Sequence, residues 1–239
     1  MGLDACGLRI KLFADGANRA QILKQATDPA ISGFTTNPTL MRSSGVVDYR
    51  AFARDILMHV RDKPISFEVF ADDHEEMRRQ AEEISTWGSN VYVKIPVTNT
   101  RREPSVDLVR LLTQEGIKVN VTAVFTIDQV SSVAAALEGG APSVISVFAG
   151  RIADTGRDPV PHMRQVVEVA ARAPLAEVLW ASPREVLNLY QADAIGCHII
   201  TMTPDLLAKI ALQNRDLHDY SHDTVKMFYD DAATAGYRL

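Results

Sequence analysis

Cysteines and long hydrophobic runs are scarce in this chain. Only two of its 239 residues are cysteines, Cys6 and Cys197, which are too few for a disulfide framework and lack metal-ligand spacing. No apolar run approaches the roughly 20 residues that a membrane-spanning helix needs. The N-terminus has neither a basic segment nor an extended apolar core, so we expect no signal peptide. These absences favour a protein of the reducing cytoplasm and disfavour disulfide-stabilised and membrane-spanning classes.

Positive charge is not in excess either. The 25 lysines and arginines are outnumbered by 30 aspartates and glutamates, which gives a net charge of −5. Nucleic-acid-binding proteins usually present a basic face, so we expect no nucleic-acid partner. Hydrophobic residues make up 46% of the chain, which is typical of a globular domain. No repeat or linker interrupts the sequence, so we expect one domain over residues 1–239, with 215–239 as a C-terminal helical tail.

Short β-branched runs alternate with longer amphipathic segments along the chain. The predicted strands are 10–15, 31–36, 65–71, 91–97, 119–125, 144–149, 177–182 and 197–203. Helical spacing predicts helices at 51–60, 74–87, 106–112, 187–192, 206–212 and 224–235, with helix starts marked by Asp48 and Asp128. Strict alternation favours a parallel sheet, and eight units predict an α/β fold, a (β/α)8 TIM barrel with an extra C-terminal helix. An open doubly wound sheet is the competitor, but its usual glycine-rich turn after the first strand is missing, since only Gly16 stands there.

Lys94 stands in the middle of the apolar strand at 91–97. A lysine amine loses hydration on entering such a strand, so it either reaches out at a strand edge or is kept for its chemistry. Burial disfavours the charged form, and the neutral amine is the form that attacks a carbonyl. A structural role is the commoner explanation for an isolated lysine of this kind. The surrounding residues favour the chemical one.

Polar residues recur where the predicted strands end, which is where TIM barrels carry their reacting groups. They are Asp15, Asn37, Glu68, Asn120, Thr122, Ser146, Arg151, Ser182 and Arg184. Each also has a structural explanation: a turn or helix cap for Asp15 and Asn37, or a buried ion pair between Glu68 and Lys94. Strand periodicity puts Asn120 with Thr122, and Ser146 with Phe148, on the lumen side with Lys94. So many coincidences around one ring predict an active site.

Two segments resemble the signature sequences of the transaldolases. They are Gly-Phe-Thr-Thr-Asn-Pro-Thr-Leu at 33–40 and Val-Tyr-Val-Lys-Ile-Pro-Val-Thr at 91–98. The resemblance extends over residues 10–205, and the chain length is similar to that of the short transaldolases, a group that includes fructose-6-phosphate aldolase. This resemblance implies a class I aldol mechanism with Lys94 as the Schiff-base lysine, and neither a metal nor an organic cofactor.

The resemblance also assigns roles to the other strand-end residues. Asp15 moves the proton of the hydroxyl at the cleaved bond, and Glu68 acts through a water that Thr122 holds. Sugar hydroxyls are bound by Asn37, Asn120 and Ser146. The phosphate is bound by Arg151 and Arg184, with Ser182 beside them. One departure concerns Pro183, which replaces the usual aromatic residue before Arg184 and puts the placement of that arginine in doubt.

Two positions bear on the choice within the group. The fructose-6-phosphate aldolase branch has Gln in place of Glu68 and Tyr in place of Phe148, so this chain resembles the transaldolases at both. The expected reaction is transfer of dihydroxyacetone from sedoheptulose 7-phosphate or fructose 6-phosphate to glyceraldehyde 3-phosphate or erythrose 4-phosphate, as in the pentose phosphate pathway. The alternatives are an aldolase that releases free dihydroxyacetone, a transaldolase for an unusual sugar in a specialised pathway, and a non-catalytic sugar-phosphate-binding barrel.

The C-terminal segment bears on assembly. Apolar Val225, Met227 and Phe228 stand among charges in the predicted last helix. The resemblance implies a homo-oligomeric ring, such as a decamer, that uses this helix. The alternative is that the helix folds against its own barrel.

Overall fold

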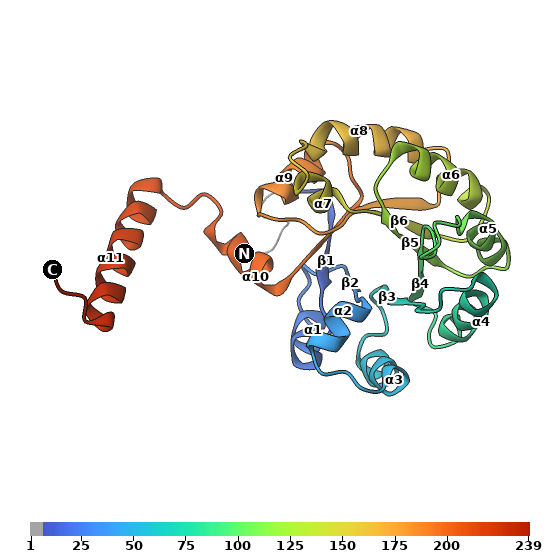
Figure 1. The fold of residues 1–239 in the computed structure, drawn as a ribbon, viewed down its shortest axis with the longest axis horizontal. Coiled ribbons are helices and arrows are strands. Elements are labelled where there is room, and N and C mark those ends of the chain that lie inside the picture. Colours follow the sequence, from blue (N-terminus) through green and yellow to red (C-terminus); the bar gives the residue numbers. More distant parts are fainter. Residues whose placement is uncertain (1–6) are drawn as a thin grey trace.

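Eight parallel strands form a closed barrel in the computed structural model, which describes residues 7–239 (Figure 1). In chain order the strands are β1 Lys11–Asp15, β2 Gly33–Thr35, β3 Ile65–Glu68, β4 Val91–Pro96, β5 Val119–Val124, β6 Ser143–Val147, β7 Ala176–Trp180 and β8 Ile199–Met202. Each strand pairs with the next, and β8 pairs with β1. The predicted (β/α)8 barrel is confirmed, and the open doubly wound sheet is excluded.

Helices surround the barrel on the outside, and a last helix, α11, follows them at the C-terminus (Figure 1). They are α1 Arg19–Ala26, α2 Pro38–Ser43, α3 Tyr49–His59, α4 His74–Ser85, α5 Val106–Gln114, α6 Ile127–Leu137, α7 Ala149–Ala153, α8 Pro159–Ala170, α9 Leu187–Ala194, α10 Pro204–Lys209, the 3-10 turn η2 Ile210–Leu212, and α11 Leu217–Ala235. Every predicted helix overlaps an observed one. Four observed helices, α1, α2, α7 and α8, had no predicted counterpart, and for α6 only a start was predicted.

Local sequence explains where the helices begin. Asp48 caps α3 as predicted, because its carboxylate accepts the N–H of Ala51 at 2.9 Å. The predicted start at Asp128 is wrong. Thr126 and Gln129 form a reciprocal capping box there, so α6 begins at Ile127 and Asp128 lies inside its first turn.

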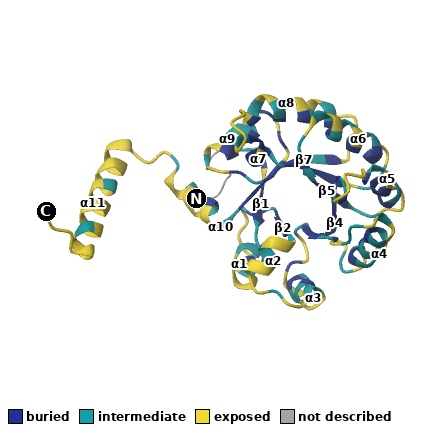
Figure 2. Ribbon diagram, viewed as in Figure 1, coloured by how far each residue is buried: buried dark blue, intermediate teal, exposed yellow. Residues whose placement is uncertain are grey.

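The barrel lumen has an apolar layer beneath a polar one. Phe13, Val144, Leu179 and Ile199 form the apolar layer and are almost fully buried. Gly33 makes room for it, since a Cβ at that position would lie 2.5 Å from the Phe13 ring. A second, larger apolar core fills the space between the strands and the helices. In Figure 2 the strands and the adjoining parts of the helices are dark blue, the colour of buried residues. The polar residues at the strand ends therefore stand above a closed floor.

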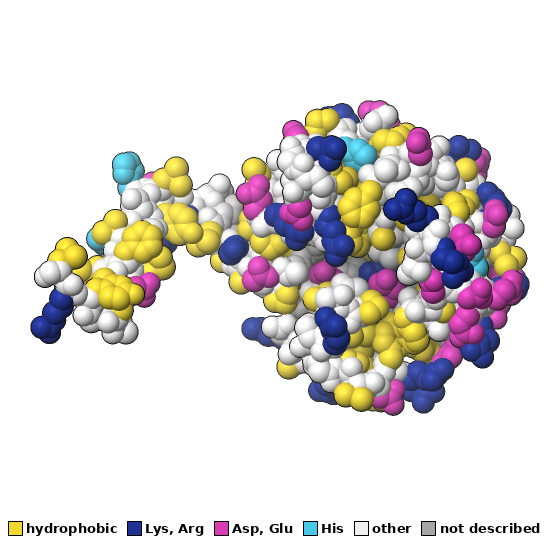
Figure 3. Space-filling view, viewed as in Figure 1, with side chains coloured by type: hydrophobic (Ala, Val, Ile, Leu, Met, Phe, Trp, Pro, Cys, Tyr) yellow, Lys and Arg dark blue, Asp and Glu magenta, His cyan; other side chains and the backbone are white. Residues whose placement is uncertain are grey.

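Helix α11 extends away from the barrel (Figures 1 and 2). It begins at Leu217, seven residues before the predicted start at 224, and none of its residues is buried. Large apolar side chains on it are exposed, and they appear as a yellow surface in Figure 3: Leu217, Tyr220, Val225, Met227, Phe228 and Tyr229. The extra C-terminal helix is confirmed. The alternative, in which it folds against its own barrel, is not what the structure shows.

Cys197 has a structural role. Its Sγ lies 3.4 Å from the carbonyl oxygens of both Val178 and Ile199, and burial raises the pKa of the thiol to about 12. Cys6 lies outside the described residues.

Over residues 7–239, no helix has the length and apolar character that a bilayer crossing requires.

Candidate active site

Lys94 points into the lumen from β4 and is only 6% exposed. Its Nζ donates a hydrogen bond to the carbonyl oxygen of Thr36 at 2.9 Å and lies 3.2 Å from Oε2 of Glu68. Glu68 and Lys94 occupy directly paired positions on β3 and β4, so the register of the sheet brings them together. The ion pair that could have been purely structural is therefore present. Both of its members also face an open cavity.

This cavity has a volume of about 480 Å³ and lies at the C-terminal end of the barrel. Nine of the predicted site residues line it: Asp15, Asn37, Glu68, Lys94, Thr122, Ser146, Phe148, Arg151 and Ser182. Two predicted residues do not, Asn120 and Arg184. All eight strands contribute at least one lining residue, as expected for a TIM-barrel active site.

Asp15, the last residue of β1, is held by a chain of threonines. Thr35 donates a hydrogen bond from Oγ1 to Oδ1 of Asp15 at 2.7 Å, and the hydroxyls of Thr35 and Thr201 lie 2.5 Å apart. Burial raises the pKa of the Asp15 carboxyl, while the charge of Lys94 and the Thr35 hydrogen bond partly offset the rise. Asp15 therefore keeps a proton more readily than an exposed aspartate, which suits a group that both takes and returns protons.

Thr35 and Thr201 were not among the predicted site residues. The available signal was a single polar residue within an otherwise apolar strand, at Thr201 in Ile199–Met202. Lys94 in β4 shows the same signal.

Thr122 combines burial with a hydroxyl that has no partner. It is 3% exposed and lines the cavity, and its Oγ1 makes no hydrogen bond to any described residue. The next residue, Ala123, has a φ of 58°, and the pairing of β5 with β6 shifts register between Val121 and Val124. Such bulges re-aim side chains and recur beside active sites. Because a buried hydroxyl without a partner costs free energy, Oγ1 of Thr122 is available to bind a polar group in the cavity.

Asn120 lies behind the cavity wall. Its Oδ1 accepts a hydrogen bond from Ser146 at 2.7 Å, and its Nδ2 donates to Ser66 at 3.0 Å. Asn120 itself does not line the cavity, but its bond to Ser146 supports a residue that does. Asn37 has the structural role considered for it, since Oδ1 caps α2 by accepting the Leu40 N–H at 2.9 Å, and it lines the cavity as well.

A cation and a tight loop form one side of the cavity. Arg151, exposed on α7, places its guanidinium 4.9 Å from the centre of the Phe148 ring. Ser182 has a φ of 56°, and its carbonyl approaches Gly150 so closely that a Cβ there would lie 1.5 Å from it. Glycine is thus required at 150 for the loops after β6 and β7 to meet.

Arg184 points elsewhere. Its guanidinium forms a two-pronged ion pair with the carboxylate of Asp154, with Nε 2.9 Å from Oδ1, and this bond lowers the pKa of Asp154. The predicted phosphate arginine is therefore paired within the protein and outside the cavity wall. Arg184 is paired in this way because Asp154, the C-terminal cap residue of α7, lies next to the loop that carries Arg184.

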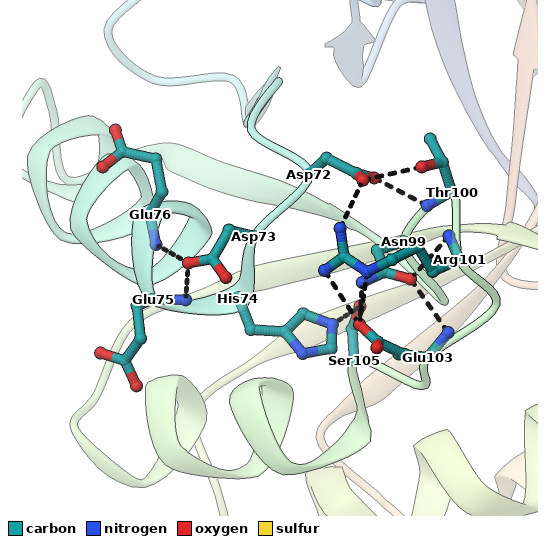
Figure 4. Close-up of polar contacts among 10 residues, drawn as sticks. All are labelled: Asp72, Asp73, His74, Glu75, Glu76, Asn99, Thr100, Arg101, Glu103 and Ser105. Atoms are coloured by element: carbon teal, nitrogen blue, oxygen red, sulfur yellow. Dashed lines mark hydrogen bonds and ion pairs between the residues drawn. The ribbon is translucent and has the colours of Figure 1, made fainter.

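The loops after β3 and β4 are fastened to each other (Figure 4). Asp72 accepts hydrogen bonds from the backbone and hydroxyl of Thr100, both at 2.7 Å, and pairs with Arg101 at 3.1 Å. Asn99 accepts the backbone N–H groups of Arg101 and Glu103. These bonds join the loops that follow Glu68 and Lys94.

A second hollow lies outside the barrel between α3 and α4, with a volume of about 620 Å³. Its charged residues pair with each other, Arg50 with Glu83 and Arg79 with Glu76, and its floor is aromatic. No group of three potential metal ligands occurs within residues 7–239. The lumen cavity brings together Asp15, Glu68, Lys94 and the unpartnered hydroxyl of Thr122, so it is the candidate active site.

The structure is thus a (β/α)8 barrel with a buried lysine and two carboxylates in one cavity at the C-terminal end of its strands. Comparison with known proteins agrees. The sequence profile of the Transaldolase/Fructose-6-phosphate aldolase family matches residues 12–238. A probable transaldolase of Thermoanaerobacter sp. is 32% identical over 231 residues, which cover 96% of this chain and 100% of that protein. A probable transaldolase of Dehalococcoides mccartyi is 33% identical over 202 residues, which cover 84% and 90%.

The chain belongs to the transaldolase/fructose-6-phosphate aldolase family, and this membership supports an enzyme with transaldolase-type aldolase activity. Among solved structures, KGPDC from Streptococcus mutans superimposes with a TM-score of 0.56 at 11% identity, covering 82% of this chain and 88% of that one. Identity this low supports the fold alone.

Proposed function

We propose that this protein is a transaldolase that transfers a dihydroxyacetone unit through a Schiff base on Lys94. The observation that carries the proposal is the position of the Lys94 amine. It is 6% exposed and lies in the lumen cavity, with a carboxylate 3.2 Å away and a second, proton-retaining carboxyl, Asp15, on the same cavity wall. An amine in this setting is suited to attack a carbonyl.

In the proposed reaction Glu68 accepts a proton from the Lys94 ammonium, and the free amine attacks the ketone carbon of a ketose phosphate. Loss of water gives an iminium ion on Lys94. Asp15 takes the proton of the hydroxyl on the departing carbon, the carbon–carbon bond breaks, and its electron pair moves to the iminium to form an enamine. The departing fragment is an aldose phosphate. The enamine then attacks a second aldose phosphate, Asp15 returns the proton, and water releases the ketose product.

The remaining residues bind and orient the reactants. Thr122 holds the water that Glu68 activates, which would give the hydroxyl the partner it lacks. Asn37 and Ser146 bind sugar hydroxyls, and Ser146 is kept in place by Asn120. Arg151 and Ser182 bind the phosphate, for which the planar guanidinium is a good match. The donors are sedoheptulose 7-phosphate and fructose 6-phosphate, and the acceptors are glyceraldehyde 3-phosphate and erythrose 4-phosphate.

The Schiff base is tested by adding borohydride to the enzyme with fructose 6-phosphate and mapping the modified peptide by mass spectrometry. A reduced three-carbon adduct on Lys94 is expected. Lys118→Met is the matched control, because Lys118 lies just before β5, at the opposite end of the strands, and its Nζ is bonded to the carbonyl of Ser89. This variant should form the adduct normally. An adduct on another lysine, or none at all, contradicts the proposal. A non-catalytic sugar-phosphate-binding barrel would also form none.

The second candidate is an aldolase that splits fructose 6-phosphate and releases dihydroxyacetone. Phe148 favours transfer over release, because its ring lines the cavity without a hydroxyl that could activate water. The two reactions are separated by incubating the enzyme with fructose 6-phosphate and no acceptor. A transaldolase releases at most about one dihydroxyacetone per active site over the first turnovers, whereas an aldolase releases it continuously.

We also propose that the protein assembles into a homo-oligomeric ring through α11. Support comes from the apolar side chains of this helix, which remain exposed because no part of the barrel covers them. An exposed apolar surface of this kind usually marks an interface. Light scattering should give a mass several times that of one chain. Val225→Glu combined with Phe228→Glu should reduce it to that of one chain or a smaller assembly, and an unchanged mass would count against α11.

A further inference from the structure

The barrel wall has a gap beside Glu68. Strand β2 contains only three residues and pairs with β3 at Phe34–Ile65 and Thr35–Ser66. On the other side of β3, the N–H groups of Ile65 and Val69 bond to β4 and the turn before it. Backbone direction alternates along a strand, so the N–H and C=O of Glu68 face the β2 side, beyond the last pair that β2 provides. These two groups need another partner, because buried backbone polar groups are almost always bonded.

Tyr49 fills this gap with a single hydroxyl. Its oxygen accepts the N–H of Glu68 at 2.8 Å and its O–H donates to the carbonyl of Glu68 at 2.9 Å. Tyr49 is the first residue of α3, and the Asp48 cap fixes where that helix begins. The tyrosine therefore takes the place of a neighbouring strand at the one residue of β3 that carries a proposed acid–base group.

An aromatic cluster holds the Tyr49 ring in this position. The ring lies 5.5 Å from Phe70 and 6.2 Å from Phe67, both edge-on, and 5.8 Å from Trp87. Burial raises the pKa of the Tyr49 hydroxyl, so the group stays protonated and continues to donate at any pH at which the enzyme works. Three members of the cluster, Tyr49, Phe70 and Trp87, line the outer hollow between α3 and α4.

We propose that Tyr49 is a positioning residue that sets the distance between the Glu68 carboxylate and Lys94. The inference rests on the proposed function. Oε2 of Glu68 lies 3.2 Å from Nζ of Lys94. Apart from this ion pair, the carboxylate makes no hydrogen bond to any described residue, so its position depends on the main chain of Glu68, which Tyr49 holds. With the hydroxyl removed, the main chain at Glu68 loses both bonds on one side and the carboxylate drifts. A misplacement of about 1 Å can cost about 100-fold in rate.

The test is Tyr49→Phe, which removes one oxygen and keeps the ring. We expect kcat to fall by about 10-fold to 100-fold while KM changes by less than about 3-fold, because the sugar-binding residues are untouched. The rate at which borohydride traps the adduct on Lys94 should fall by a similar factor. 4-Aminophenylalanine in place of Tyr49 keeps a donor and an acceptor at the same point, so it should restore most of the rate.

A double-mutant cycle separates positioning from general loosening of the fold. In a Glu68→Gln background the carboxylate is already gone, so Tyr49→Phe should cause less than about a 2-fold further loss. Phe70→Leu is the control, because it alters the same aromatic cluster without touching the Glu68 backbone. It should leave kcat within about 3-fold of the parent. Should Tyr49→Phe be unstable at the assay temperature, the 4-aminophenylalanine protein and Glu68→Gln still give the comparison.

The outcomes are distinct. If the parent enzyme forms the adduct normally, two results overturn the role of Tyr49 alone. One is an unchanged kcat in Tyr49→Phe. The other is a double-mutant cycle in which the kcat losses of Tyr49→Phe and Glu68→Gln multiply. Failure of the parent enzyme to form any adduct on Lys94 overturns the proposed function, and the role of Tyr49 with it.

Discussion

Nζ of Lys94 and Oε2 of Glu68 lie 3.2 Å apart on adjacent, directly paired strand positions. Their side chains are 7% and 17% exposed, so removing one partner leaves the other poorly solvated. Loss of one member of a buried pair is strongly destabilising, whereas replacing both by neutral groups is often harmless.

The first prediction follows from this pair. Lys94→Met should abolish activity and lower the melting temperature, because Glu68 is left without its cation. The double variant Lys94→Met with Glu68→Gln should remain inactive but regain most of the lost stability. Thermal unfolding of the parent, the two single variants and the double variant checks this. If the double variant is no more stable than Lys94→Met, the pair is not an energetic unit.

The fold was accessible from the sequence because period-two runs and amphipathic segments alternate eight times. All eight strands were found, and seven of them were predicted to end one to three residues too late. The run at 65–71 continues to Ala71, yet β3 ends at Glu68, the last of its residues that pairs with β4. Short helices such as α2 and α7 were missed, since five or six residues hold too little periodicity to detect.

The site was accessible to the extent that polar residues interrupt apolar strands. Partners supplied by other elements were not, because they depend on tertiary geometry. Nothing local to Arg184 indicates that Asp154 pairs with it, and nothing local to Tyr49 indicates that its hydroxyl reaches Glu68. Asn120 was correctly assigned to the lumen side, but its depth below the cavity surface follows from its bonds to Ser66 and Ser146.

The second prediction concerns Asp15→Asn, which should be inactive yet more stable at neutral pH. Burial raises the pKa of Asp15 from its ordinary value of 3.8, so the folded protein binds this proton more tightly than the unfolded chain does. The parent is therefore stabilised below pH 3.8 and loses that stability as the pH rises through the folded-state pKa. Asparagine is uncharged at every pH, so its burial does not carry the free-energy cost of burying a carboxylate, and its side-chain oxygen can still accept the Thr35 hydrogen bond.

The measurement is the melting temperature of both proteins across the pH range. The variant should gain on the parent from acid to neutral pH, by about 2–4 °C for each kcal/mol relieved. A difference that is constant with pH would show that the Asp15 carboxyl is not the source.

The third prediction uses the unpartnered hydroxyl of Thr122. Thr122→Val keeps the shape and removes a buried oxygen that has no partner among residues 7–239, so stability should be unchanged or higher. Turnover should fall by about 10-fold to 100-fold, because the catalytic water loses its anchor. Thr113→Val is the control with the reverse expectation. That hydroxyl is bonded to the carbonyl of Ala141 and lies in α5, so stability should fall and turnover should not.

The fourth prediction concerns the ion pair between Asp154 and Arg184. Asp154→Asn frees the guanidinium, and KM for phosphorylated substrates should fall by about 5-fold or less, because a half-exposed pair is worth at most about 1 kcal/mol. KM for acceptor aldehydes that carry no phosphate should not change. Glu138→Gln, which frees Arg172 elsewhere on the surface, is the matched control and should have no effect. A rise in KM would show instead that Asp154 holds Arg184 where the phosphate needs it.

The fifth prediction addresses the choice between transfer and release. Phe148 lines the cavity beneath the Arg151 guanidinium and beside Phe125, at a ring-centre distance of 5.7 Å from the latter. Phe148→Tyr adds a hydroxyl to this wall, and Glu68→Gln removes the carboxylate that the transaldolase cycle uses on water. Together they should shift the enzyme towards continuous release of dihydroxyacetone from fructose 6-phosphate without an acceptor. Phe125→Tyr is the control, because it adds a hydroxyl to the neighbouring ring, which does not line the cavity. The ratio of dihydroxyacetone released to unit transferred measures the shift, and a ratio equal to that of the parent would mean that these two positions do not decide the reaction.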